Sequence, residues 1–225
     1  WTSRYPSFSL DATLTATTDV FDAAYSPTGE FVAIRENQYV KIYNVSTQTL
    51  LQTSAQISSS WWGNRLSWSP DGTMLAASIS SGVNIYWTSN LTEIQTAIAP
   101  TDPGTVRDVA FFPNGSGFIA VGEGWGSNSG KVYAANAVNG TIWHSFQPNN
   151  ESSFSSVALS PDGSRAAVGG DGVVYVINTS SWQVTRTINH GSQNVRGVDI
   201  SPDGNWISAC DDTGLAYQST VLRVW

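Results

Sequence analysis

The chain has 225 residues, with 10 basic and 17 acidic side chains and a net charge of −7. Its lysines and arginines form no cluster of the kind that binds a phosphate backbone or an anionic membrane, so we expect no nucleic-acid partner. No apolar run reaches the roughly 18 residues that cross a bilayer, so we expect no membrane insertion, and the single cysteine, Cys210, excludes a disulfide framework within the chain.

The first strand-like segment is 9–15, where apolar and polar residues alternate. A turn motif then occurs five times, at Ser26-Pro27-Thr28-Gly29, Ser69-Pro70-Asp71-Gly72, Phe112-Pro113-Asn114-Gly115, Ser160-Pro161-Asp162-Gly163 and Ser201-Pro202-Asp203-Gly204. Successive prolines of the motif are 43, 43, 48 and 41 residues apart. Repetition near one period indicates five copies of one structural unit.

A complete copy contains four predicted strands. An apolar run precedes the proline, as in 106–111, and Pro and Gly favour a tight turn after it. A second apolar run such as 74–77 follows, and then a run rich in aromatic and β-branched residues such as 83–87. A more polar strand, as in 184–188, completes the copy. Four strands in roughly 42 residues are typical of a propeller blade.

The recurring Ser-Pro-Asp-Gly turn and the ending Val-Ile-Asn-Thr at 176–179 resemble the WD-repeat propellers and, more closely, the YVTN-type surface propellers. The resemblance covers essentially the whole chain and is strongest at 157–188. It implies one all-β domain over 1–225, a β-propeller of four-stranded antiparallel blades. Residues 1–18 would form a closing outer strand, and the blades would lie at about 19–56, 57–100, 101–149, 150–190 and 191–225.

The repeats also differ from the WD family. No Gly-His pair opens them, and the usual Trp-Asp ending is replaced by Tyr43-Asn44, Ile177-Asn178 or Trp225. The sequence therefore does not predict the buried His-Asp network of that family.

The ring can close in three ways. The fifth copy stops at its third predicted strand, so segment 9–15 is expected to supply the fourth and to close a five-bladed ring, which removes exposed sheet edges. In the second interpretation, the chain is part of a larger propeller, most simply seven-bladed. In the third, the orphan strand pairs with a neighbouring subunit and links copies into a fibre.

Acidic residues in the first strands raise the question of catalysis, because five-bladed propellers include glycosidases that carry carboxylates at the channel. Asp22 and Asp108 both stand five residues before the repeat proline, and two carboxylates near one axis can act as acid and nucleophile or base. We favour the alternative that they are channel-lining groups bonded to water or to Arg107. The remaining copies hold Arg65, Ser156 and Gly197 at that position.

Other groups that could carry chemistry are scarce. The two histidines, His144 and His190, are expected at the surface, and no nucleophile elbow or calcium-binding loop occurs. We therefore predict no catalytic residue, no cofactor and no metal ion.

The chain carries six Asn-x-Ser/Thr sequons, and five of them fall on turns that share one face of the predicted ring. The candidate N-glycosylation sites are Asn44, Asn90, Asn114, Asn139, Asn150 and Asn178, and ordinary Asx turns are the alternative interpretation. Asn150 is expected on the opposite side. That opposite face is formed by blade connections and carries the candidate binding residues Trp61, Trp62, Arg107, Trp125, Asp211, Asp212 and Tyr217.

These observations favour a non-catalytic extracellular propeller that serves as a rigid interaction or building module of a cell-surface or fibrous assembly. Charged residues make up only 12% of the chain, and this neutral composition is more typical of secreted and surface proteins. Its partners would be other proteins, including copies of itself, or glycans. The rival interpretation is a lectin or glycan-processing propeller that uses the loop face and the channel carboxylates.

Overall fold

The computed structural model describes residues 18–57, 63–98, 105–123, 130–211 and 222–224. In these ranges the regular elements are β-strands and one short 3-10 helix, Pro148–Asn150. No helix in the described part of the chain is long and apolar enough to span a membrane.

Three complete antiparallel sheets come first, each with its four strands in chain order. The first sheet contains β1 (Val20–Tyr25), β2 (Phe31–Glu36), β3 (Tyr39–Asn44) and β4 (Leu50–Thr53). The second contains β5 (Leu66–Trp68), β6 (Met74–Ile79), β7 (Gly82–Trp87) and β8 (Glu93–Ile98). The third contains β9 (Val106–Phe111), β10 (Gly117–Gly122), β11 (Lys131–Asn136) and β12 (Ile142–Phe146).

A long strand joins the last two units. The strands of this part are β13 (Ser156–Leu159), β14 (Arg165–Gly169), β15 (Asp171–Asn178), β16 (Gln183–Ile200), β17 (Ile207–Asp211) and β18 (Leu222–Val224). Residues Gln183 to Asn189 of β16 pair with β15, and Val195 to Ile200 pair with β17. The strand β16 is therefore the fourth strand of the fourth sheet and the first strand of the fifth, although the sequence predicted two separate strands.

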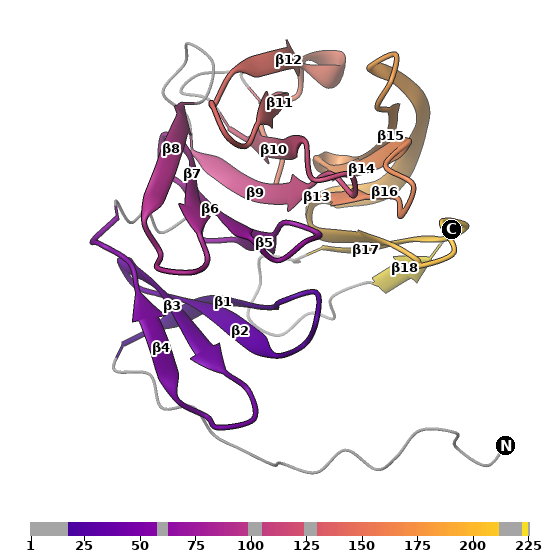
Figure 1. The fold of residues 1–225 in the computed structure, drawn as a ribbon. Coiled ribbons are helices and arrows are strands. Elements are labelled where there is room, and N and C mark those ends of the chain that lie inside the picture. The colour runs from indigo at the N-terminus through magenta and orange to yellow at the C-terminus, as the bar shows by residue number, and fades with distance from the viewer. Residues whose placement is uncertain (1–17, 58–62, 99–104, 124–129, 212–221, 225) are drawn as a thin grey trace, which may run out of the picture.

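Successive sheets are arranged side by side around a centre (Figure 1). The first strands contact one another in order, β1 with β5, β5 with β9, β9 with β13, and β13 with β16. This arrangement confirms the predicted all-β propeller of four-stranded antiparallel blades. The predicted closing strand at 9–15 lies outside the described residues.

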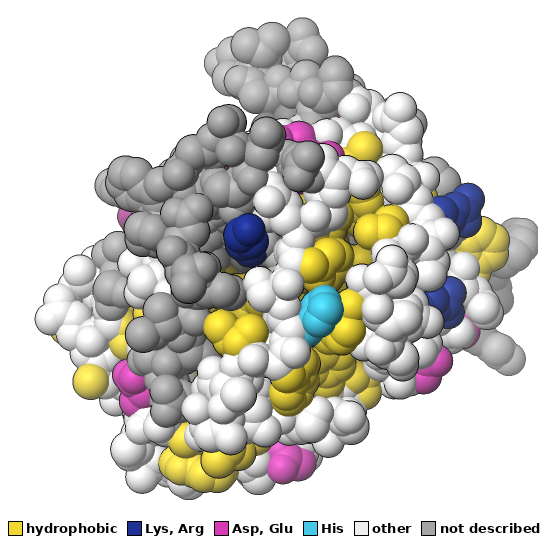
Figure 2. Space-filling model, turned by 90° about the horizontal axis from the view of Figure 1, so that it is seen from above, with side chains coloured by type: hydrophobic (Ala, Val, Ile, Leu, Met, Phe, Trp, Pro, Cys, Tyr) yellow, Lys and Arg dark blue, Asp and Glu magenta, His cyan; other side chains and the backbone are white. Residues whose placement is uncertain are grey.

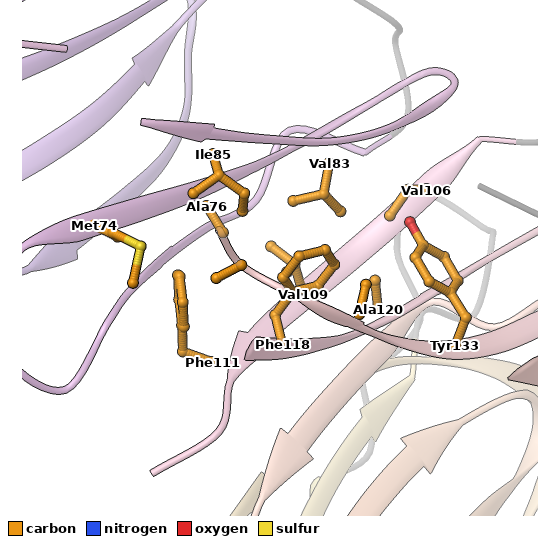
Figure 3. Close-up of a cluster of buried hydrophobic side chains, with 12 residues drawn as sticks. Met74, Ala76, Val83, Ile85, Val106, Val109, Phe111, Phe118, Ala120 and Tyr133 are labelled. Carbon is orange, nitrogen blue, oxygen red and sulfur yellow. The ribbon is translucent and has the colours of Figure 1, made fainter. Parts of the chain in front are cut away.

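The core lies between neighbouring sheets rather than inside any one of them. Figure 3 shows the interface of the second and third sheets, where Val83 and Ile85 of β7 face Val109 and Phe118. Along β10, Phe118 packs toward the second sheet and Ile119 toward the fourth, and both are fully buried. Because a strand turns alternate side chains to opposite faces, burial of both faces requires the continuous apolar runs seen in the sequence.

The five repeat turns have one geometry. In the second copy, Asp71 Oδ1 accepts hydrogen bonds from Ser69 Oγ (2.6 Å) and from the Thr73 backbone N–H (3.0 Å), which lower the pKa of the Asp71 carboxyl. The glycine of every motif has a positive φ between 71° and 73°, a conformation that only glycine adopts without strain. The motif was therefore correctly interpreted as a tight turn.

These turns also touch across sheets. A Cβ added to Gly72 would lie 3.7 Å from Cδ of Pro27 in the preceding sheet, and one added to Gly163 would lie 3.2 Å from Cδ of Pro113. Gly115 and Gly204 face the prolines of their preceding sheets in the same way. A Cβ on Gly29, in the first sheet, would have no described atom within 4 Å. Each turn thus packs on the turn before it, from the second sheet to the fifth.

Candidate functional site

The position five residues before the repeat proline links neighbouring sheets. Asp22 Oδ2 accepts a hydrogen bond from the backbone N–H of Leu66 in the next sheet, at 2.7 Å. In the same register, Asp108 Oδ2 accepts from the N–H of Val157 at 2.9 Å. Ser156 Oγ continues the pattern by accepting from the N–H of Val198 at 3.2 Å. We call these three contacts the inter-sheet clasps.

The Asp108 carboxyl is the most perturbed acid of this set. Loss of hydration raises its pKa to about 6, although the N–H of Val157, the hydroxyl of Ser156 and the N–H of Val109 all donate to it. A raised pKa is one mark of a catalytic acid. Here, however, three donors already occupy the carboxylate oxygens, so the described geometry supports a linking role.

Different residues stand at the same register in the other two sheets. Arg65 in the second sheet lies 3.5 Å from Asp22 and also stabilises the charged form of Asp108, which lowers the pKa of that carboxyl. The second sheet is instead joined to the third by Ser67 Oγ, which accepts from the N–H of Phe111 at 3.0 Å. Gly197 in the fifth sheet has no side chain with which to make a clasp.

Two of the predicted binding residues lie in the described part of the chain. Arg107 is bonded to Glu123 rather than to a channel carboxylate, so the expected contact of Arg107 with Asp22 or Asp108 is not what the structure shows. Asp211 ends β17 and is mostly buried. The remaining predicted binding residues fall outside the described residues: Trp61, Trp62, Trp125, Asp212 and Tyr217.

The expectation of surface histidines was wrong for His190. Its side chain is fully buried, its Nδ1 lies 3.4 Å from Asp211 Oδ2, and its Nε2 lies 3.3 Å from the carbonyl oxygen of Ala209. One buried His-Asp pair is therefore present where the sequence did not predict the network. The sequence held one signal for this pair. His190 precedes the fifth repeat, and two consecutive acidic residues, Asp211 and Asp212, follow the second predicted strand of that repeat. No group of three or more potential metal ligands occurs among the described residues.

A groove on the face of the repeat turns was not predicted. It lies between the third and fourth sheets and has a volume of about 390 Å³. Its lining includes the aromatic rings of Phe112, Trp143 and Trp182 and the polar side chains of Asn114, Asp162 and Thr179. We call it the Trp143 groove.

The aromatic side chains that line this groove pack on one another and on a neighbouring histidine. Trp182 stacks on His144 with ring centroids 4.5 Å apart, and Phe112 packs against both Trp143 and Trp182. The indole of Trp143 nevertheless remains 43% exposed. These residues come from strands and turns of two sheets, so their meeting depends on the two sheets packing side by side.

Five of the six sequons lie on the turns that line this face, as predicted. Asn44, Asn90, Asn114, Asn139 and Asn178 all use Oδ1 to accept backbone or hydroxyl hydrogen bonds within their own turns. Asn150 ends the short 3-10 helix between β12 and β13. The turns thus have the Asx geometry of the alternative interpretation, and glycosylation stays a prediction.

One face of the molecule is sparsely charged. Figure 2 shows one face on which Lys, Arg, Asp and Glu side chains are few and hydrophobic side chains gather around a histidine. The exposed large hydrophobic residues of the described surface include Trp87, Trp143 and Trp206.

Comparison with known proteins agrees with this architecture. A family model described as "WD domain, G-beta repeat" matches residues 140–178 and 182–216. No curated protein matches the chain. Among solved structures, Kuenenia stuttgartiensis hydrazine synthase is similar, with a TM-score of 0.76 and 17% identity over 96% of this chain and 65% of that chain. At this identity the likeness shows the fold alone, and the present chain spans 65% of the length of that structure.

The matched segments explain how repeats and sheets are related. The first match runs from the outer strand β12 through β15, and the second begins just before the outer strand β16. A sequence repeat therefore contains the last strand of one sheet and the first three of the next. Residues 140–216 therefore contain sequence that matches the WD-repeat model, and the stacked four-stranded sheets give the chain the β-propeller fold.

Proposed function

We propose that this WD-repeat propeller, a protein-interaction module, acts outside the cell as a rigid, non-catalytic binding or building unit of a surface assembly. The inter-sheet clasps are the observation that carries the proposal. They hold neighbouring first strands together through Asp22, Asp108 and Ser156, and the same contacts occupy the carboxylates that glycan hydrolysis would need. A stiff ring presents its loops in a fixed arrangement, so a partner binds at a lower entropic cost.

The composition supports the extracellular location. The polar residues of the chain are mainly neutral Ser, Thr and Asn, and only 12% of its residues are charged. In the described turns, neutral side chains such as Asn44 and Asn114 accept hydrogen bonds from residues of the same turn. The second candidate, a glycan-processing propeller, has one observation in its favour, the raised pKa of Asp108.

Two measurements test the proposal. Surface biotinylation of intact source cells, followed by detection with an antibody against this chain, should label the protein before lysis. Labelling only after lysis would contradict the extracellular location. Incubation of the purified chain with a panel of aryl glycosides should release no aryl alcohol, whereas turnover that disappears in both Asp22→Asn and Asp108→Asn would establish the enzymatic alternative.

The kind of partner can be addressed separately. Sedimentation velocity over a rising concentration series distinguishes assembly of copies of this chain from a requirement for a different protein. Growth into long species with purified chain alone would identify the building-unit role, and a constant monomer would identify a binding module for other proteins.

A further inference from the structure

We propose that the Trp143 groove binds the ring of a neutral pyranose sugar. This inference rests on the proposed binding function and names the ligand class of a site on the turn face. It does not involve the channel or the carboxylates of the inter-sheet clasps.

Three properties of the groove favour a sugar. First, the exposed indole of Trp143 offers a flat apolar surface, and the packing of Phe112 against Trp143 helps to hold that surface in place. A pyranose ring has an apolar C–H face that packs on such a surface. The groove volume of about 390 Å³ lies in the range of small-molecule sites.

Second, polar groups surround the aromatic surface. Asn114, Asp162 and Thr179 line the groove together with further serine hydroxyls from the turns of both sheets. Hydrogen bonds from Ser160 and Ser164 lower the pKa of the Asp162 carboxyl to about 2, so it is ionised at neutral pH, and these two residues already donate to both of its oxygens. Amides, hydroxyls and a carboxylate are the groups that can bond to the ring of hydroxyls on a sugar.

Third, the charge of the lining disfavours anionic ligands. The lining residues include one carboxylate and no lysine or arginine, which disfavours phosphates and other anions. The equivalent groove between the first and second sheets, of about 450 Å³, includes Ile42 and Leu51 in its lining. The two grooves therefore differ in chemistry although both are formed by neighbouring sheets.

The sugar has two sources that the structure allows. One is a free or partner-borne saccharide. The other is a glycan on Asn114, whose side chain lines the groove and belongs to a sequon. In that case an oligosaccharide is transferred from a lipid diphosphate donor: sugar C1 bonds to Nδ2 of Asn114, the C1–O bond to the diphosphate breaks, Nδ2 loses a proton and the lipid diphosphate leaves.

The test uses oxidation of tryptophan by N-bromosuccinimide, read by peptide mass spectrometry. Chain made in a bacterial host without N-glycosylation is treated with and without millimolar methyl β-glycosides of glucose, galactose and N-acetylglucosamine. At least one glycoside should slow oxidation of Trp143 several-fold and leave Trp87 unchanged. Trp87 is a matched control because it is 41% exposed and lines the other groove.

A second arm uses chain made in a secretory host that adds N-glycans. Slow oxidation of Trp143 in this chain, restored to the fast rate by Asn114→Gln, identifies the attached glycan as the occupant. Protection by free glycosides identifies a free saccharide site. If neither arm protects Trp143, or if tetramethylammonium alone protects it, the proposal is overturned.

Variants add an affinity measurement. Trp143→Ala should weaken glycoside binding at least tenfold in a calorimetric titration, whereas Trp143→Phe should retain most of it and Trp87→Ala should not change it. If Trp143→Ala does not fold, the oxidation assay on the unaltered chain still decides. Glycoside turnover or an internal location would contradict the proposed function but would leave the result at Trp143 unaffected.

Discussion

The carboxylate of Asp108 in the third sheet accepts the backbone N–H of Val157 in the fourth sheet at 2.9 Å. The N–H groups on the inner edge of a first strand have no further strand to pair with, so a side chain from the neighbouring sheet can bond to them. Asp22 makes the same contact between the first and second sheets. Side chains in one register thus join sheets that share no strand-to-strand ladder.

The first prediction concerns the loss of one clasp. At about pH 4, Asp108→Ala should lower the free energy of unfolding by about 2 kcal/mol, because it leaves the N–H of Val157 and the hydroxyl of Ser156 without this acceptor. Urea denaturation followed by tryptophan fluorescence measures the change. Asp199→Ala is the control, since the Asp199 carboxylate bonds to the N–H of its own neighbour Ile200. An equal loss in both variants would contradict the role of the clasp.

The second prediction is a pH dependence. Burial raises the pKa of Asp108 from 3.8 to about 6, so the folded chain holds this proton more tightly than the unfolded chain does. The contribution of Asp108 to stability is therefore fully present below about pH 4 and is lost as the pH rises through about 6, by up to about 3 kcal/mol.

This dependence is measured as a difference between variants. Urea midpoints of the unaltered chain and of Asp108→Asn should diverge between pH 4 and 7, with the unaltered chain losing stability relative to the variant. Other carboxyls, such as Asp162 with its lowered pKa, titrate in both proteins and cancel. Parallel profiles would show that Asp108 has an ordinary pKa.

The third prediction separates backbone strain from contact between sheets. Gly29 and Gly163 have nearly the same φ, 73° and 71°, so alanine costs about 1–2 kcal/mol at either position through the left-handed conformation. An added Cβ meets Pro113 at 3.2 Å in Gly163→Ala and meets no described atom within 4 Å in Gly29→Ala. Thermal unfolding should therefore show a larger loss for Gly163→Ala, and equal losses would contradict the packing of one turn on the next.

The fourth prediction concerns a strained turn position. Trp182 and Gln48 occupy equivalent turns and have positive φ values of 56° and 57°. Trp182 stacks on His144 and packs on Phe146 in the neighbouring sheet, whereas Gln48 is exposed. Trp182→Gly should therefore lower the free energy of unfolding by about 2–3 kcal/mol, because the loss of aromatic packing exceeds the relief of strain.

Gln48→Gly is the matched control for that change. It relieves the same backbone strain without losing packing, so its effect should stay within about 1 kcal/mol. Equilibrium urea unfolding of the two variants gives the comparison. A destabilisation of Gln48→Gly as large as that of Trp182→Gly would mean that the turn itself, rather than the aromatic contact, determines the cost.

The amino-acid sequence by itself determined the repeating unit. The spacing of the Pro-x-Gly turns, the alternation within strands and the apolar runs are local properties, because turn geometry and strand periodicity depend on residues close together in the chain. Strand 106–111 and the five turns were therefore predictable, and five of the six sequon asparagines were placed correctly on turns.

Only the tertiary structure decided which side chains meet across sheets. Asp108 reaches Val157 and Trp182 reaches His144 over long separations in sequence, and His190 is buried with Asp211 by the packing of the fifth sheet. No local pattern encodes such pairs, because they depend on the stagger between two stacked sheets. For the same reason, only the structure shows that Asp22 and Asp108 link neighbouring sheets and that the Trp143 groove exists.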